Sequence, residues 1–383
     1  IERSEWILMS KPYIEYASWE VVQVPDIDNA VDIQFQLVEN NRGKTVFKVG
    51  HSSVDRSFVA AEYDVNNLLG YGISSSMALQ YSHIAKDVSF SISHPNIFGG
   101  PWGYESSVNY RRANSKKADE QDHVLHDISF SHGVSRRLDD HNDLLVSLGY
   151  SYLTLKNKDQ GDNVDYQPFV DIFSRDVEQY SLSGSWRANY LNRFLMPQSG
   201  YKHSLDLGLH RVLGNGSHSD WTSFKYRAVK YFPLKLGPSN DQDWVFFVAS
   251  TFGANTSLGS NDVPFFNRFF GGGHGSVRGY KPFTLGDKNA DGEARGGDYQ
   301  TDLSLNLVVP NFISPDLRST LFFDAGQVHL SKIKLNKMRY ASGLTLEYTI
   351  ASYLPVTVSL GWGHNPGGVE KRKAFIWDFG FTF

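Results

Sequence analysis

A strict two-residue alternation of apolar and small polar side chains constrains this sequence more than any other feature. In the segment Val88–Ser93 every second residue is Val, Phe or Ile, and all the residues between them are serine. A helix would spread these apolar side chains around its circumference, whereas a strand places them on one face. The segment is therefore predicted to be a β-strand with one apolar face and one serine face.

The same alternation returns along the chain from Gly43 onward, in segments separated by polar or glycine-rich turns. Counting these segments gives about sixteen, an even number that is typical of single-chain bacterial barrels. Three further examples carry their apolar side chains at Tyr180, Leu182, Gly184, Trp186, Ala188 and Tyr190, at Leu303, Leu305, Leu307 and Val309, and at Val356, Val358, Leu360 and Trp362. The repetition predicts an all-β chain.

The second face of these strands separates a membrane barrel from a soluble β-sandwich. A soluble sandwich should carry charged residues there, but the positions are mainly Ser, Gly, Thr and Asn. An aromatic row at the end of the chain suits lipid better than water. It comprises Phe375, Trp377, Phe379, Phe381 and Phe383. We expect an antiparallel transmembrane β-barrel of about sixteen strands with a wet, polar lumen.

Composition excludes several other classes of protein. No apolar run reaches the roughly 18 residues that a membrane-spanning helix needs. The absence of cysteine excludes disulfides, thiolate catalysis and Cys-ligated zinc, and it is compatible with an oxidising compartment. The net charge of -4, with no basic run longer than Lys371–Lys373, argues against nucleic acid as a partner.

Residues 1–40 follow a different pattern. Apolar residues near helical spacing precede two strand-like runs, Trp19–Val24 and Val31–Val38, which are joined by a turn at 25–29. One helix and one hairpin bury too little apolar surface to be stable alone, so we expect them to pack on the barrel or to belong to a larger module. The chain begins at Ile1 without a signal peptide, so we expect a processed or truncated start.

A connection of about forty residues, approximately 254–296, is far longer than most connections and is therefore a candidate for function. It contains the aromatic segment Phe265–Phe270, then a glycine run, then Val277, Arg278, Gly279 and Tyr280. Aromatic residues beside a glycine run suggest a loop that folds back into the lumen, where close backbone approach requires glycine.

An arginine inside the barrel needs a carboxylate partner for its fork of N–H donors. If Leu321, Phe323 and Ala325 face lipid, the alternation directs Asp324 into the lumen. Asp324 is therefore the predicted partner of Arg278.

No enzyme, metal or cofactor site is predicted. The segment Asp287–Gly292, with Asp298 further on, matches part of an EF-hand calcium loop. However, no helices flank it and Ala294 replaces the usual large apolar residue, so we interpret it as a polar surface loop. The 13 histidines form no zinc-protease motif, no Ser–His constellation is singled out, and the glycine run lacks the Gly-Lys-Ser or Gly-Lys-Thr of a phosphate loop.

These features resemble the POTRA-domain barrel insertases of bacteria. The resemblance is carried by Val277–Tyr280 in the long loop, by the segment around Asp324, and by the aromatic last strand with Gly380. It also covers residues 1–39, which look like the second half of a POTRA module. The resemblance implies a partial α+β POTRA domain at 1–40, lying in the periplasm, and a barrel at 41–383 in the outer membrane of a Gram-negative bacterium.

The resemblance also implies a mechanism. The loop motif docks through Arg278 on Asp324, and the first strand, near Lys44 to Ser53, meets the last at a weak seam, or lateral gate, that opens sideways to template client strands. A kink is predicted at Gly380. A second acidic position of the family falls at Asn306, so the Arg278 pairing is expected to rest mainly on Asp324. The predicted seam residues are Lys44, Val46, Lys48, Phe375, Phe379, Gly380 and Phe383.

The function expected from this resemblance is insertion of unfolded β-barrel client proteins into the outer-membrane bilayer, together with lipoproteins of the assembly complex. Two alternatives stay open. One is a secretion pore of the two-partner or translocation-assembly type, within the same superfamily. The other is a passive porin, which is less well supported because it should show an inward loop with charged constriction residues instead of this motif.

Overall fold

The computed structural model describes most of the chain. No helix among the residues it describes is long and apolar enough to cross a membrane. The described residues are 14–24, 31–39, 43–52, 56–97, 100–114, 123–157, 165–193, 196–234, 236, 244–289, 292, 294–310, 313–314, 317–350, 354–366 and 372–382.

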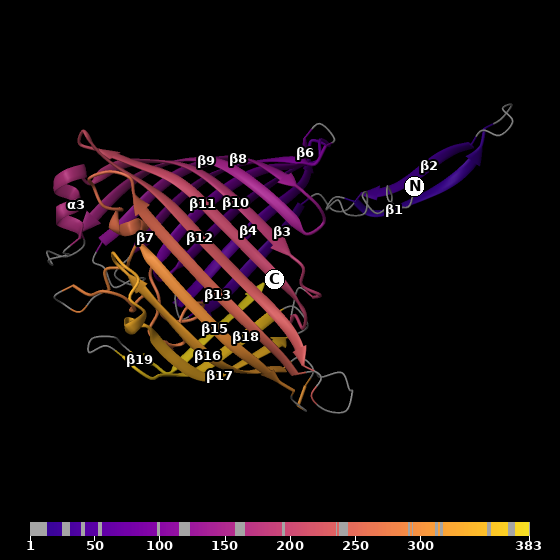
Figure 1. The fold of residues 1–383 in the computed structure, drawn as a ribbon. Coiled ribbons are helices and arrows are strands. Elements are labelled where there is room, and N and C mark those ends of the chain that lie inside the picture. Colours follow the sequence, from indigo (N-terminus) through magenta and orange to yellow (C-terminus); the bar gives the residue numbers. More distant parts are fainter. Residues whose placement is uncertain are drawn as a thin grey trace.

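Within these residues, one closed antiparallel barrel dominates the fold (Figure 1). Its first strand, β3 (Gly43–Ser52), pairs with its last, β20 (Phe375–Thr382), and this pairing closes the barrel. The strands between them are β4 (Arg56–Leu68), β5 (Ile73–Ser82), β6 (Ala85–Ile97), β7 (Trp102–Asn114), β8 (His123–Arg137), β9 (Asn142–Asn157), β10 (Asp176–Asn189), β11 (Gly200–Gly214), β12 (Ser217–Leu234), β13 (Trp244–Ser257), β15 (Tyr299–Val309), β16 (Leu317–His329), β17 (Arg339–Ile350) and β18 (Leu354–Gly363).

Two short pieces of strand and two 3-10 turns lie outside this order. The strand pieces are β14 (Gly279–Tyr280) and β19 (Arg372–Lys373), which pair with each other. The turns are η1 (Phe265–Asn267) in the long loop and η2 (Leu335–Lys337) between β16 and β17.

Antiparallel pairing gives the barrel two distinct ends. We call the end where β3 begins the hairpin end, because Figure 1 shows the N-terminal hairpin on that side. The opposite end, which we call the loop end, carries helix α3 (Tyr166–Phe173) and the long connection 258–298. β20 runs from the loop end towards the hairpin end.

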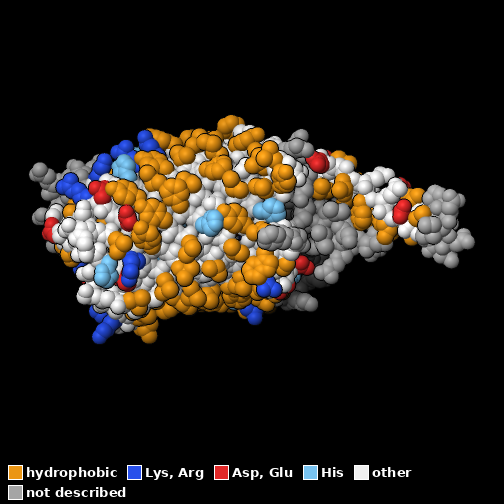
Figure 2. All heavy atoms as spheres, turned by 90° about the horizontal axis from the view of Figure 1, so that it is seen from above, with side chains coloured by type: hydrophobic (Ala, Val, Ile, Leu, Met, Phe, Trp, Pro, Cys, Tyr) orange, Lys and Arg blue, Asp and Glu red, His pale blue; other side chains and the backbone are white. Residues whose placement is uncertain are grey.

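The predicted alternation sorts side chains between the outer wall and the lumen. Val88 and Phe90 are 41% and 46% exposed, in keeping with an outward apolar face. On β16, Leu321 and Phe323 are exposed, whereas Asp324, the residue after Phe323, is fully buried. Figure 2 shows hydrophobic side chains spread over the visible outer wall, with most charged side chains towards the ends. An apolar wall of this kind is what lipid solvates.

The N-terminal hairpin forms a separate two-stranded sheet. β1 (Ile14–Gln23) and β2 (Val31–Glu39) pair antiparallel, with Trp19 opposite Phe35. β2 matches the run expected at Val31–Val38, whereas β1 begins five residues before the run expected at Trp19–Val24. The predicted helical segment near the start of the chain and the turn at 25–29 lie outside the described residues.

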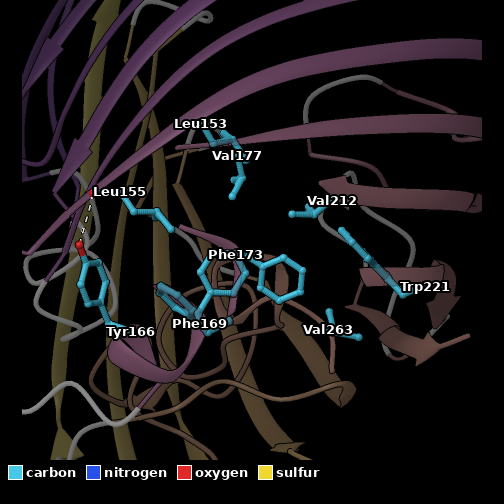
Figure 3. Packing of buried hydrophobic residues seen from close by; sticks show 10 residues of the cluster. Leu153, Leu155, Tyr166, Phe169, Phe173, Val177, Val212, Trp221 and Val263 are labelled. Atoms are coloured by element: carbon cyan, nitrogen blue, oxygen red, sulfur yellow. Dashed lines mark hydrogen bonds between the residues drawn. The ribbon is translucent and has the colours of Figure 1, made fainter. Parts of the chain in front are cut away.

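An apolar cluster, which we call the cap, lies at the loop end of the barrel beside β9 to β12 (Figure 3). Helix α3 contributes Tyr166, Phe169 and Phe173, spaced so that all three lie on one face, and each is almost fully buried. Phe169 packs edge-on against Phe265 of the long loop, with ring centroids 5.7 Å apart. The cap therefore joins the α3 connection to the long loop, and it fixes where that loop enters the barrel. Its other buried members are Leu153, Leu155, Val177, Val212, Trp221 and Val263.

Candidate functional site

The long connection carries the predicted motif into the barrel. The strand before the loop extends beyond its predicted end and the strand after it begins slightly later than predicted, so the loop spans 258–298 instead of 254–296. The reason is that β12 is long enough to pair with β13 as far as Ser257. Val277 and Tyr280 of the motif are fully buried, in a cluster with Leu285 of the same loop and Ala341 of β17.

Arg278 and Asp324 are brought together by the structure. The arginine Nε donates to Asp324 Oδ2 and its Nη2 donates to Oδ1, both at 2.7 Å, and the backbone N–H of Arg278 donates to Oδ2 at 3.0 Å. Asp324 is 0% exposed. This bidentate geometry is the strong form of an arginine–carboxylate pair, and it also aligns the loop backbone.

Polar residues of neighbouring strands also accept from the two Nη atoms of Arg278. Nη1 donates to Thr345 Oγ1 at 3.1 Å, and the two hydrogens of Nη2 are shared between Asp324 and the acceptors Ser304 Oγ and Asn306 Oδ1, each at 2.9 Å. Because Asn306 is not acidic, the sequence predicts that the pairing of Arg278 rests mainly on Asp324. In the structure the amide oxygen of Asn306 also accepts a hydrogen bond from Arg278. The network therefore spans β15, β16 and β17.

An aromatic ring completes the arginine site. The guanidinium of Arg278 lies 3.6 Å from the ring centroid of Phe322, a cation–π distance. The ring lies against glycines of the next two strands, because a Cβ built on Gly343 or Gly361 would approach its Cζ to 2.7 or 3.1 Å. Sequence reasoning missed Phe322, although it occupies the lumenal position two residues before Asp324.

The motif also forms a short ladder with the segment before the last strand. Gly279 pairs with Lys373 and Tyr280 pairs with Arg372. Gly279 has φ +89, and a Cβ there would lie 3.0 Å from the backbone N of Gly363. Glycine is therefore required at 279 both for its left-handed conformation and for close approach to β18.

The seam between β20 and β3 is short among the described residues. Its register pairs are Phe379 with His51, Gly380 with Gly50, Phe381 with Val49 and Thr382 with Lys48. The first half of β20 pairs on its other edge with β18, from Phe375 opposite Leu360 to Phe379 opposite Val356. Among the described residues, the ladder with β18 on one edge of β20 ends at Phe379, and the ladder with β3 on the other edge begins there.

Lys44 and Val46 lie on β3 and Phe375 lies on β20, the two strands that meet at the seam, and the described register covers part of the predicted residues. Lys44 and Val46 pair with β4 and have no partner on β20 among the described residues, and Phe375 pairs with β18. Lys48, Phe379 and Gly380 do lie in the seam ladder. Phe383 lies outside the described residues, and the predicted outward aromatic row falls largely on side chains that are not described.

A buried ion triad, missed by sequence reasoning, holds the cap to the long loop. Asp165, just before α3, accepts from Arg295 Nη2 at 2.5 Å and Nε at 2.9 Å, and from Arg268 Nη1 at 3.1 Å. Burial by itself would raise the pKa of Asp165, but hydrogen bonds from Arg295 and the charge of Arg268 hold that pKa below its usual value. The long loop is therefore held at two places, by Asp165 at the cap and by Asp324 at Arg278.

Replacing Asp165 by Asn should loosen the cap, because Arg268 and Arg295 lose their shared buried carboxylate. Breaking a buried pair typically costs about 3–5 kcal/mol. We expect faster protease cleavage of the long loop, measured by limited proteolysis and mass spectrometry. Asp143→Asn is the control, since its partner Arg137 lies at 3.7 Å and both are more than 60% exposed. Equal cleavage in the two variants would contradict a tethering role for Asp165.

Asp287 of the calcium-like segment makes polar contacts with the turn after β16. Asp287 accepts from the backbone N–H of Leu330 at 3.3 Å and lies 3.6 Å from Lys337 Nζ. No three His, Asp or Glu side chains within the described ranges are grouped so that they could hold a metal ion. Asp291 lies outside those ranges.

Asp298 should make the stability of the folded long loop depend on pH. Burial raises the pKa of Asp298 to about 6, with Asp262 adding to the rise and Arg268 opposing it. Because this folded-state pKa exceeds the ordinary value of 3.8, the contribution of Asp298 to stability is present in acid and is lost as pH rises through about 6. We expect cleavage of the long loop, normalised to the unfolded chain, to increase from about pH 5 to 7. Asp298→Asn should flatten this dependence; an unchanged profile would contradict the assignment.

Comparison with known proteins places these features in a family. Residues 67–383 match the family described as the Omp85 superfamily domain. The outer membrane protein assembly factor BamA of Neisseria meningitidis serogroup B (strain ATCC BAA-335 / MC58) is 24% identical over 348 residues, which cover 86% of this chain and 42% of that protein. The chain thus spans less than half the length of this relative.

Solved structures give the same fold. BamA from Haemophilus ducreyi, lacking POTRA domains 1–3, superposes with a TM-score of 0.86 at 22% identity, covering 100% of this chain and 78% of that one. CdiB from Acinetobacter baumannii superposes with a TM-score of 0.59 at 16% identity, covering 97% of this chain and 66% of that one. The BamA structure is the more similar of the two.

Proposed function

Because the chain belongs to the Omp85 superfamily, we propose that it is the barrel part of an insertase that assembles β-barrel client proteins in the bacterial outer membrane. The observation that carries the proposal is the seam. It has four register pairs among the described residues, and β18 with β20 has five, whereas other neighbouring barrel strands share between eight and fifteen.

The physical argument rests on unpaired backbone groups. An unsatisfied N–H or C=O in lipid costs several kcal/mol, so a barrel normally zips every strand along its length. Within the described residues, the seam ladder joins Lys48–His51 of β3 to Phe379–Thr382 of β20. Strands held by a short ladder separate at a lower cost, and each strand edge can then pair with another strand by β-augmentation. A client strand entering the seam would satisfy the backbone groups that such a separation exposes.

The loop motif would keep the lumenal side ordered while the seam works. Arg278 ties the loop to β15, β16 and β17, and among the described residues none of its hydrogen bonds goes to β3 or β20. The fixed wall of the barrel therefore holds the loop, and the seam strands are left free to separate.

The wider assignment follows from the same proposal. The barrel would have sixteen strands, and residues 1–40 would be the end of a POTRA domain lying in the periplasm. The partners would be unfolded barrel clients, lipoproteins of the assembly complex and the bilayer itself. The protein would act without catalytic residues, metal or cofactor.

A secretion pore is the alternative, favoured by the similarity in fold to CdiB. The two functions differ in the final location of the client protein. An insertase leaves it folded in the membrane, whereas a pore releases it on the far side. Protease protection of a client added to liposomes separates these outcomes.

The test of the proposed function is client insertion into liposomes that contain the full-length protein. A disulfide between Val49→Cys and Phe381→Cys, which are opposite in register, would lock the seam, and residues 1–383 contain no other cysteine. We expect the oxidised lock to lower insertion of a urea-unfolded barrel client at least about tenfold, because the strands cannot part. Reduction should restore it. Insertion that is indifferent to the lock would refute the seam mechanism.

A further inference from the structure

A row of basic side chains crosses the outer wall at the loop end of the barrel. Lys86 of β6 is opposite Arg112 of β7 in register, and Arg112 is opposite His126 of β8. These residues share the outward face of their strands with exposed apolar residues such as Val88 and Tyr110. Neighbouring strands lie about 4.8 Å apart, so the row spans about 10 Å. Figure 2 shows Lys and Arg side chains gathered beside a His at this end of the visible wall.

The charges of this row are not neutralised within the wall. Among the residues that the structure describes, no Asp or Glu oxygen lies within 4 Å of Lys86, of Arg112 or of Lys156, which is placed diagonally from His126 on β9. Like charges directly opposite each other destabilise a sheet. The pair of Lys86 and Arg112 therefore favours an anion that is supplied from outside the chain.

A small cavity lies beside the row. Its volume is about 210 Å³, and its lining includes Lys86, Arg112, Tyr81, Asn114 and the turn 82–85. The ammonium of Lys86 lies 4.9 Å from the ring centroid of Tyr81, a cation–π contact that holds it at the cavity. The Oδ1 of Asn114 is buried and has no hydrogen-bond partner within the described part of the chain. The cavity thus offers two cations for a phosphate and one acceptor for a neighbouring hydroxyl or amine.

From this arrangement we infer that Lys86, Arg112, His126 and Lys156, which we call the basic patch, bind the phosphate of a membrane lipid. A lipid is favoured over a soluble anion because the patch adjoins the apolar wall. Val88 and its neighbours on β6 continue from Lys86 towards the hairpin end and would contact the acyl chains. With residues 1–40 in the periplasm, as proposed, this lipid belongs to the outer leaflet. The inference goes beyond the proposed function and involves no client protein.

Lipid binding to the full-length protein in detergent micelles, measured by native mass spectrometry, tests the basic patch. The probes are diphosphorylated lipid A and phosphatidylcholine, whose choline offsets the charge of its phosphate. The triple variant Lys86→Gln, Arg112→Gln and Lys156→Gln should bind lipid A at least about tenfold more weakly and phosphatidylcholine within about twofold of wild type. Raising the salt from about 50 to about 500 mM should also weaken lipid A binding to the wild type. Equal lipid A binding by wild type and triple variant would overturn the inference.

Arg211→Gln is the matched control. Arg211 is also exposed near the loop end of its strand, but it pairs with Asp220 at 2.7 Å, so its loss should change lipid A binding less than about twofold. A loss as large as in the triple variant would mean that any surface arginine gives the effect, against a specific patch. Should the triple variant not fold, as judged by tryptophan fluorescence in urea, Arg112→Gln alone should still weaken binding at least about threefold.

Inorganic phosphate separates a lipid site from a site for a free anion. At about 10 mM it should displace less than half of the bound lipid A, because it lacks the acyl chains that contact the wall. Complete displacement would overturn the assignment of a lipid. The measurement contains no client, so its failure leaves the proposed insertion function standing, and a failure of client insertion leaves the basic patch standing.

Discussion

Arg278→Ala is expected to lower the free energy of unfolding by about 3–5 kcal/mol, because it leaves a buried carboxylate without its guanidinium. Asp324 is 0% exposed and would keep only the backbone N–H of residue 278 and the hydroxyl of Ser304, which donates at 2.6 Å. Urea unfolding in detergent micelles, followed by fluorescence of the 8 tryptophans, measures the loss. Under the proposed function, client insertion should fall as well.

Arg227→Ala is the matched control for this prediction. Arg227 also pairs with a carboxylate, Asp206 at 2.8 Å, but its side chain is 49% exposed, so its loss should cost no more than about 1 kcal/mol. The double variant Arg278→Ala with Asp324→Asn should lose less than the sum of the two single variants, since each removes the same interaction. A strong buried pair would be contradicted if Arg278→Ala and Arg227→Ala lowered the free energy of unfolding equally. It would also be contradicted if the loss in the double variant equalled the sum of the losses in the two single variants.

Gly343→Ala is expected to cost about 1–3 kcal/mol through overpacking between two barrel strands. A Cβ at this position would overlap the carbonyl oxygen of Leu360 and would lie 2.7 Å from Cζ of Phe322. Either β17 and β18 move apart or the Phe322 ring leaves its place beneath Arg278. Urea unfolding measures the cost, and altered proteolysis of the long loop reports the displaced arginine.

Gly184→Ala serves as the control, because its Cβ would meet nothing within 4 Å. Alanine in an open strand position should leave stability unchanged or raise it by up to about 1 kcal/mol, since it reduces the entropy of the unfolded chain. If Gly343→Ala proves as mild as Gly184→Ala, close approach of β17 and β18 is not required for the arginine site.

The strand pattern was accessible from the sequence because it depends on local order alone. Alternation in segments such as Val88–Ser93 states which side chains share a face, whatever the partners are. The same rule put Asp324 on the lumenal face of its strand, and the structure places it there. Pairing Arg278 with Asp324 needed only the further premise that a lumenal arginine seeks a carboxylate.

Side chains that cooperate across several strands could be predicted only in part. Asn306 was treated as a departure that narrowed the network, yet its amide oxygen accepts from Arg278. Residue type alone did not reveal that a neutral acceptor lies within reach. The α3 helix had a local signal, the spacing of Tyr166, Phe169 and Phe173, but a single turn or two of helix is easily lost beside the long barrel pattern.

The sequence by itself determined the class of fold, the faces of the strands and the motif that enters the lumen, because each depends on periodicity or on the chemistry of one residue. Only the tertiary structure decided the Asp165 triad, the pairing of β14 with β19 and the register of β20 against β18 and β3. These contacts join segments about a hundred or more residues apart or depend on strand register, and closure of the barrel sets both.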